Sequence, residues 1–185
     1  TRGGVATGYD RLLIATGSDP FIIPVPGHDL HGVVSFRDMD DVNRMLAAAG
    51  RGGNAVVIGG GLLGLEAAHG LSLRGMKVTV LHLMPTLMER QLDEAAGWLL
   101  KQALEARGQT ILTGADTAAI LGDGKVEAVR LKDGAEIPAD LVVMAVGIRP
   151  NAALAREAGL DVGRGIKVDD RMQTSDPAIL AVGEC

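Results

Sequence analysis

Residues 54–82 constrain the fold of this chain more than any other segment. Their sequence, NAVVIGGGLLGLEAAHGLSLRGMKVTVLH, runs from a short apolar stretch through a cluster of glycines into a helical pattern and then a second apolar stretch. A strand, a turn, a helix and a second strand in this order form one unit of a parallel sheet. At the first strand-to-helix turn, Gly59, Gly61 and Gly64 have the spacing G-x-G-x-x-G. The segment therefore predicts a dinucleotide-binding turn.

Each glycine of this turn has its own expected role. Gly59 allows the tight turn, Gly61 lets the backbone approach a pyrophosphate, and Gly64 lets the helix lie close to the strand. The free N–H groups and the positive end of the helix dipole would then bind the phosphates. A purely structural turn is the alternative, but the strand before it and the helix after it favour nucleotide binding. The predicted contacts from this turn are Gly59, Gly60, Gly61, Leu62, Leu63 and Gly64.

The composition agrees with an α/β fold. Apolar residues make up 47% of the chain and 26 of its 185 residues are glycine, which is about twice the usual share. Parallel strands that are buried on both faces need this balance of small and aliphatic residues. We predict a Rossmann-like domain with a parallel sheet, and the length leaves room for part of a second domain.

Charge and cysteine content exclude several classes of protein. The net charge of −5 offers no basic surface for nucleic acid. The single cysteine, Cys185, excludes an intrachain disulfide framework and fits a reducing compartment. No apolar run approaches the length of a membrane span, and residues 1–4 do not resemble a signal peptide. We expect a cytoplasmic protein with no membrane partner.

The remaining pattern predicts elements on both sides of the glycine motif. Residues 9–17 predict a strand, and a stretch rich in Pro and Gly follows it as a crossing between domains. Ser35 is the predicted cap of a helix over residues 38–49. The apolar face predicted for this helix consists of Phe36, Met39, Val42, Leu46 and Ala49.

Further along the chain, residues 91–107 predict an amphipathic helix with a core-facing side. That side consists of Leu92, Ala95, Ala96, Leu99, Ala103 and Leu104. Asp93 is expected to complement the helix dipole. Two Asp-Gly pairs between apolar runs predict an antiparallel meander over residues 118–137. Residues 141–146 and 179–182 predict buried strands.

Three signatures resemble one family. They are Ala15-Thr16-Gly17, the glycine motif with Glu66, and AVGIRPN at residues 145–151 followed by ILAVGE at 179–184. Together they resemble the pyridine nucleotide–disulfide oxidoreductase superfamily of flavoproteins. Within it, the sequence LMERQLD at 87–93 and the final Gly-Glu-Cys are most similar to the large subunits of assimilatory NAD(P)H nitrite reductases.

The resemblance implies a domain plan. Residues 27–147 would form an inserted NAD(P)H-binding domain, residues 1–26 part of an FAD-binding domain and the crossing, and residues 148–185 an incomplete return into the FAD domain. The chain begins just before a strand and stops at a strand end, so we expect an internal piece of a longer protein.

The resemblance also implies roles for individual residues. Glu66 would lie near the junction of nicotinamide and flavin, with the turn at Val146 and Gly147 lining the nicotinamide site. Glu184 would hold the ribityl chain of FAD, although Asp is usual at this position elsewhere in the superfamily. Thr16, Gly17 and Gly183 belong to the same predicted set of cofactor contacts.

Two features that the superfamily often carries are absent from the sequence. No strand–G-x-G-x-x-G–helix unit precedes Tyr9, so the pyrophosphate site for FAD is missing, and no C-x₄-C pair is present for dithiol chemistry. The sirohaem and iron–sulfur parts of a nitrite reductase would lie beyond Cys185.

The end of the second strand of the motif departs from the usual pattern. An acid usually binds the adenosine ribose there, whereas this chain has His82. One interpretation is that NADPH is tolerated, with Arg90 near its 2′-phosphate; the other is that His82 simply faces solvent. His28 and His31 lack a third ligand at a known spacing, so we expect no metal site.

Three functional hypotheses follow from the resemblance. The parent protein would pass a hydride from NAD(P)H to FAD and reduce nitrite to ammonia, with no catalytic side chain in this segment. The alternatives are a reductase for ferredoxin or rubredoxin, and an isolated nucleotide-binding fragment without turnover. If the flanks lack partner strands, Leu12–Ala15 and Ile179–Val182 would expose apolar edges, and we expect a homodimer or disorder of these flanks.

Overall fold

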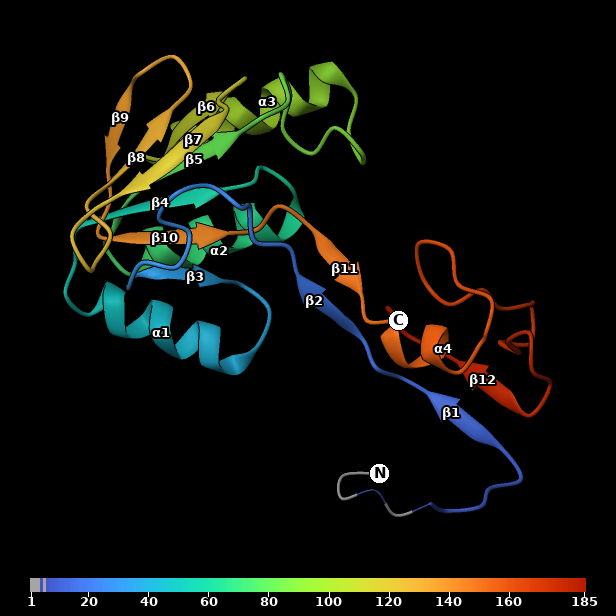
Figure 1. Cartoon of the computed structure of the whole chain (residues 1–185). Helices are drawn as coiled ribbons and strands as arrows, with labels where there is room; N and C mark the ends of the chain where they lie inside the picture. The colour runs from blue at the N-terminus through green and yellow to red at the C-terminus, as the bar shows by residue number, and fades with distance from the viewer. Residues whose placement is uncertain (1–3, 5) are drawn as a thin grey trace. The chain divides into compact units, whose positions relative to one another are not determined.

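The computed structural model describes residue 4 and residues 6–185, and it divides into two compact units (Figure 1). The larger unit is Pro20–Gly147. The smaller unit contains the described residues up to Asp19 together with Ile148–Cys185.

The larger unit is built on the predicted parallel sheet, which has five strands. Its strands, in spatial order, are β3 (Val33–Ser35), β10 (Leu141–Met144), β4 (Asn54–Ile58), β5 (Lys77–His82) and β6 (Thr110–Thr113). Ile58 pairs with Met144 on one side and with Leu81 on the other. This register brings the carboxyl ends of three strands to one edge of the sheet, where α/β folds bind their ligands.

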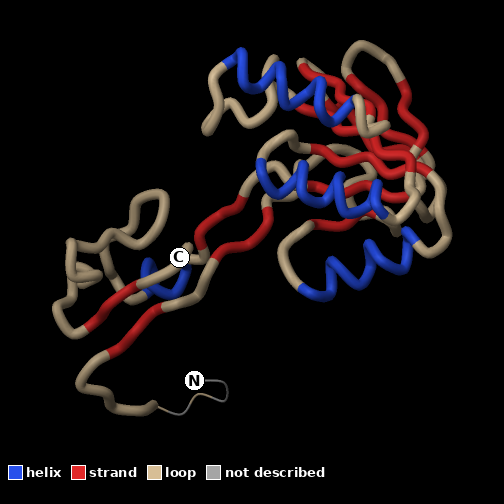
Figure 2. The backbone as a smooth tube through the Cα atoms, turned by 180° about the vertical axis from the view of Figure 1, so that it is seen from behind, coloured by secondary structure: helices blue, strands red, loops and turns tan. Residues whose placement is uncertain are grey.

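Three helices pack on one face of this sheet: α1 (Met39–Ala49), α2 (Leu62–Leu73) and α3 (Glu94–Glu105). They appear as blue coils beside the red strands in Figure 2. Strand β4 contributes Ala55 and Val57 to the core under the helices, whereas Val56 and Ile58 belong to a second core on the opposite face. This alternation explains why the strand is a continuous apolar run.

The second face is covered by the predicted antiparallel meander. Its strands are β7 (Thr117–Leu121), β8 (Ala128–Leu131) and β9 (Glu136–Pro138). The glycines of both Asp-Gly pairs, Gly124 and Gly134, have φ of +70° and +92°, which glycine adopts without steric cost.

The N-cap of the first helix lies three residues after the predicted one. Ser35 ends strand β3, which was not predicted, and Asp38 is the N-cap of α1: its carboxylate accepts from the Asp41 N–H at 2.9 Å. The predicted apolar face is also wrong in part, because Met39 is 71% exposed. The helix buries Ala49 of the predicted face together with Asp41, Met45 and Ala48.

The third helix corrects a second prediction. It is shorter than residues 91–107, and Asp93 is its N-cap, accepting from the Ala96 N–H at 2.8 Å. The predicted core-facing side is largely exposed, with Leu99 at 60%. The helix buries Gly97 and Leu104, because Gly97 packs against Thr86 and Leu87 in the segment before the helix.

The smaller unit pairs two distant strands in parallel. Strand β1 (Leu12–Ile14) lies beside β12 (Ile179–Ala181), and a second ladder joins β2 (Ser18–Pro20) to β11 (Ile148–Pro150). A short helix, α4 (Ala153–Glu157), contributes to its core. The two strands that were expected to expose apolar edges, β1 and β12, therefore pair with each other on one side. The homodimer stays a prediction.

Within residues 4 and 6–185, no helix has both the length and the apolar character needed to cross a bilayer.

Candidate functional site

The glycine turn lies at the carboxyl edge of the parallel sheet, between β4 and α2. Gly59 has φ of +121°, and a Cβ there would collide with the Ala145 carbonyl oxygen. A Cβ at Gly64 would collide with the Gly59 carbonyl, so this glycine allows the close helix–strand approach. Gly61 differs from both, because no atom beyond its two chain neighbours lies within 4 Å of its Cβ position. The open space in front of Gly61 fits the close approach of a ligand to the backbone.

Helix α2 is the one of the three long helices that begins without a side-chain cap. Asp38 and Asp93 cap α1 and α3, whereas α2 follows Gly61 and has no side-chain hydrogen bond at its start. The N–H groups of Leu62 and Leu63 are in the first turn, where a helix has no internal acceptors. An anionic group placed there would receive these donors and the positive end of the helix dipole.

His82 does not face solvent, so that interpretation is wrong. Its side chain is only 9% exposed, and both ring nitrogens make hydrogen bonds. Nδ1 accepts from the Gly60 N–H at 3.0 Å, and Nε2 lies 3.1 Å from Oε2 of Glu89. The residue at the end of the second strand therefore links the glycine turn to a carboxylate seven residues later in the chain.

The segment after β5 is held tightly against the glycine turn. The Met88 N–H donates to the Gly60 carbonyl at 3.1 Å, and Leu87 is 1% exposed. A Cβ at Gly60 would lie 2.6 Å from Leu87 Cδ2 and 2.7 Å from His82 Cγ, so only glycine fits between them.

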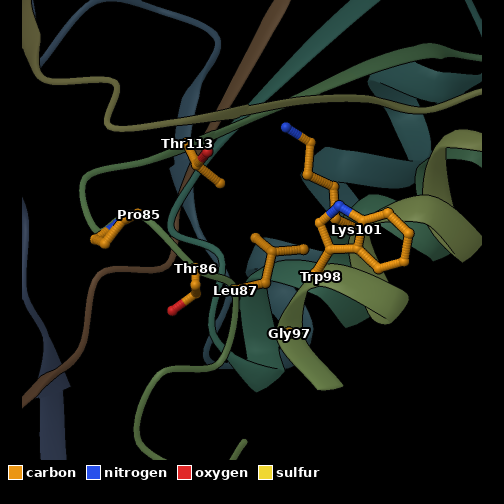
Figure 3. A pocket seen from close by; sticks show the side chains of 7 residues that line it. All are labelled: Pro85, Thr86, Leu87, Gly97, Trp98, Lys101 and Thr113. Atoms are coloured by element: carbon orange, nitrogen blue, oxygen red, sulfur yellow. The ribbon is translucent and has the colours of Figure 1, made fainter. Parts of the chain in front are cut away.

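Helix α3 supports the same segment from the other side. A Cβ at Gly97 would lie 3.0 Å from the Leu87 carbonyl oxygen, so helix and segment are in close contact. Figure 3 shows the hollow along this contact, with Pro85 and Thr86 on the segment and Trp98 and Lys101 on the helix. The segment is thus fixed between α3 and the glycine turn.

Glu89, which contacts His82, was not among the predicted site residues, whereas its neighbour Arg90 was. Arg90 is exposed, and none of the described residues makes a hydrogen bond or ion pair with it. The signal that could have identified Glu89 is an acidic residue in the loop that follows a strand ending in His82.

The turn at residues 145–147 lies next to the glycine turn, although the two are far apart in sequence. The Ala145 N–H donates to the Ile58 carbonyl at 2.8 Å. Val146 is half-buried, and Gly147 is exposed with φ of +118°. This edge therefore presents two glycine turns together.

Glu66 lies on the exposed side of α2. It lines a hollow between α1 and α2 with Leu63, Met39 and Val42. The predicted place of this carboxylate near the nicotinamide stays a prediction.

The signatures of the smaller unit also come together. Thr16 Oγ1 donates to the Asn151 carbonyl at 2.6 Å, and the Asn151 N–H donates to the Gly17 carbonyl at 2.8 Å. Ser18 Oγ donates to Oε2 of Glu184 at 2.9 Å, after Gly183 turns the chain with φ of +86°.

These residues fit one part of an FAD site. They place hydroxyl, carboxylate and glycine backbone groups near the ends of paired strands. No second strand–glycine turn–helix occurs within the described chain, so the fit does not extend to the flavin pyrophosphate.

His28 and His31, where no metal site is expected, lie in the segment before β3. His28 Nδ1 donates to the Val25 carbonyl at 2.9 Å, and within residues 4 and 6–185 no group of three potential metal ligands is found.

The sequence matches a known family over residues 2–185, the pyridine nucleotide-disulphide oxidoreductases. It is 59% identical over 177 residues to a nitrite reductase [NAD(P)H] from Bacillus subtilis, covering 96% of this chain and 22% of that protein. It is 37% identical to a rubredoxin-NAD(+) reductase from Ectopseudomonas oleovorans, covering all of this chain and 48% of that protein.

A solved ferredoxin reductase from Rhodopseudomonas palustris superposes with a TM-score of 0.94 at 34% identity, over 98% of this chain and 45% of that one. The chain spans about a fifth of the length of the nitrite reductases it matches. The family match over nearly the whole chain, the glycine turn and the parallel sheet agree, and the chain belongs to the pyridine nucleotide-disulphide oxidoreductases, a family of flavoproteins that use FAD and NAD(P)H.

Proposed function

We propose that this chain is the NAD(P)H-binding portion of a flavoprotein that passes a hydride from NAD(P)H to FAD and serves the reduction of nitrite to ammonia. The observation that carries the proposal is the start of α2, which has no side-chain cap and faces open space at Gly61. A dinucleotide pyrophosphate supplies the negative charge that such a helix end lacks.

The residues of the larger unit have distinct tasks in this proposal. Residues 59–64 bind the pyrophosphate through backbone N–H groups, while Glu66, Val146 and Gly147 are assigned to the nicotinamide end. The nicotinamide ring supplies the hydride, so the protein orients it and excludes water, and no side chain of this segment acts as acid or base.

The smaller unit is assigned to the flavin. Thr16, Gly17, Gly183 and Glu184 are the proposed contacts, with Ser18 holding the Glu184 carboxylate. The remainder of the flavin site, and the iron–sulfur and sirohaem parts that reduce nitrite, would come from the rest of the parent protein. The nitrite branch is supported by 59% identity to a nitrite reductase. The cytoplasmic location expected from cysteine usage is part of the proposal, and cell fractionation tests it.

A reductase that delivers electrons to rubredoxin or ferredoxin is the second candidate. Its support is the 37% identity to a rubredoxin-NAD(+) reductase, a match that includes all of this chain and 48% of that protein. The two candidates share the nucleotide and flavin sites and differ only in the acceptor.

Turnover of the full-length protein separates these candidates. Oxidation of NADH that depends on nitrite, and yields ammonia, supports the first. Oxidation that depends on rubredoxin or ferredoxin, and is unaffected by nitrite, would replace it with the second. If the 185-residue chain binds NADH but purifies without FAD, it is a binding module in isolation; stoichiometric FAD would refute that third reading.

A further inference from the structure

We propose that Glu89 supplies the carboxylate that receives the adenosine-side ribose of the coenzyme, and that His82 is the residue that positions it. This inference rests on the proposed function and makes that function specific, because it predicts preference for NADH over NADPH. The position that usually carries the acid is occupied here by a histidine whose ring nitrogens are both engaged.

The hydrogen bonds of His82 fix its tautomer. The Gly60 N–H can only donate, so Nδ1 must accept from it and carries no proton. The proton of the neutral ring is therefore on Nε2, where it points to Oε2 of Glu89. The imidazole therefore connects the end of β5 to the Glu89 carboxylate in the following segment.

Glu89 is held in place before any ligand arrives. Its neighbour Met88 donates to the Gly60 carbonyl and has φ of +52°, an unusual conformation for a residue with a side chain. The N–H groups of Gln91 and Leu92 donate to the Met88 carbonyl at 2.8 and 2.9 Å, closing a tight turn around Glu89. Little conformational entropy is then lost when this carboxylate binds a ligand.

The carboxylate retains an acceptor for that ligand. Oε2 faces His82, and within the described residues Oε1 has no hydrogen-bond partner. The side chain is 30% exposed, so it is accessible to a ligand, and His82 connects it to the Gly60 N–H of the glycine turn. A carboxylate accepts hydrogen bonds from ribose hydroxyls and repels a 2′-phosphate.

Arg90 opposes this preference. It is adjacent, exposed and positively charged, so removal of the Glu89 charge leaves a site that tolerates the phosphate of NADPH. With Glu89 and Arg90 side by side in the sequence, the preference for NADH over NADPH depends on the charge of Glu89.

The test titrates the full 185-residue chain with NADH and with NADPH and monitors binding by nicotinamide fluorescence. The proteins compared are wild type, Glu89→Gln, His82→Asn and the double variant. Asn retains an acceptor for the Gly60 N–H but is too short to reach Glu89. Glu127→Gln, an exposed glutamate of the meander, is the matched charge control.

We expect wild type to bind NADH at least about tenfold more tightly than NADPH, and Glu89→Gln to reduce that ratio by about tenfold. His82→Asn should reduce the ratio in the same direction, and the double variant should add little, because both changes break one link. The control should keep the wild-type ratio.

Three results would overturn the inference or its basis. An unchanged ratio in Glu89→Gln, with NADH still bound, refutes the role of Glu89 and leaves the proposed function intact. Additive effects of the two changes refute positioning by His82. Failure of wild type to bind either coenzyme overturns the proposed function and this inference together.

Discussion

Alanine substitutions at two glycines of the same motif should have opposite consequences. No atom beyond the two chain neighbours lies within 4 Å of the Cβ position of Gly61, so the methyl group of Gly61→Ala meets no other part of the folded chain. A Cβ at Gly64 would instead overlap the Gly59 carbonyl oxygen, which is backbone and cannot move aside. One variant should damage binding alone, and the other should damage the fold.

The magnitudes follow from these environments. Gly61→Ala should change the free energy of unfolding by no more than about 0.5 kcal/mol. Alanine is a slightly poorer N-cap than glycine, but it also lowers the conformational entropy of the unfolded chain, and the two effects oppose each other. Gly64→Ala should lower it by at least about 2 kcal/mol, since the strain of overpacking exceeds the better helix propensity of alanine. That loss corresponds to a fall in Tm of about 4–8 °C.

Binding should separate the variants further. The added methyl of Gly61→Ala fills the space that the pyrophosphate needs, so its Kd for NADH should rise at least about tenfold, or about 1.4 kcal/mol. Thermal unfolding by circular dichroism and NADH fluorescence titration measure the two effects on the same samples. A Gly61→Ala variant that binds NADH as wild type does would refute the assignment of this turn.

Four further outcomes are expected. Asp93→Ala removes the cap of α3 and should cost about 1 kcal/mol, seen as a lower midpoint in urea unfolding. Asp41→Ala should cost about 1–3 kcal/mol in the same assay, because this buried carboxylate accepts from Ser35 Oγ at 2.7 Å and from the Arg37 N–H at 3.0 Å. Glu184→Ala in the full-length protein should lower its FAD content, measured by flavin absorbance, while NADH binding stays unchanged. Leu13→Lys, at a position 58% exposed on β1, should shift any dimer toward monomer in size-exclusion chromatography; an unchanged dimer would place the interface elsewhere.

The parallel sheet and its glycine turn could be predicted because their signals are local. Residues 54–82 contain both strands, the turn and the helix in one continuous segment, and each residue type follows from its backbone or its burial. The meander was predictable for the same reason, since the Asp-Gly turns determine where its strands end.

The failures concern features that depend on distant partners. Val33–Ser35 is short and becomes a strand only because β10, more than 100 residues later, pairs with it. The exposed side of α3 could not be read from its own pattern, because burial there depends on the contact between Gly97 and the preceding segment.

The candidate site also contains residues that follow from a local motif and residues whose contacts depend on distant partners. The contacts expected from Gly59 to Gly64 follow from one motif, whereas the partners of His82 come from two directions. One is the Gly60 N–H and the other is Glu89, seven residues later on a folded-back loop. A histidine with this environment looks the same in sequence as one that faces solvent.

The most direct test of the central claim is the affinity of the purified chain for NADH, measured by fluorescence titration alongside the Gly61→Ala variant. We expect saturable binding to one site per chain, weakened at least about tenfold by the substitution. Absence of saturable binding, or equal affinity in both proteins, would contradict the claim that the glycine turn before α2 holds the coenzyme.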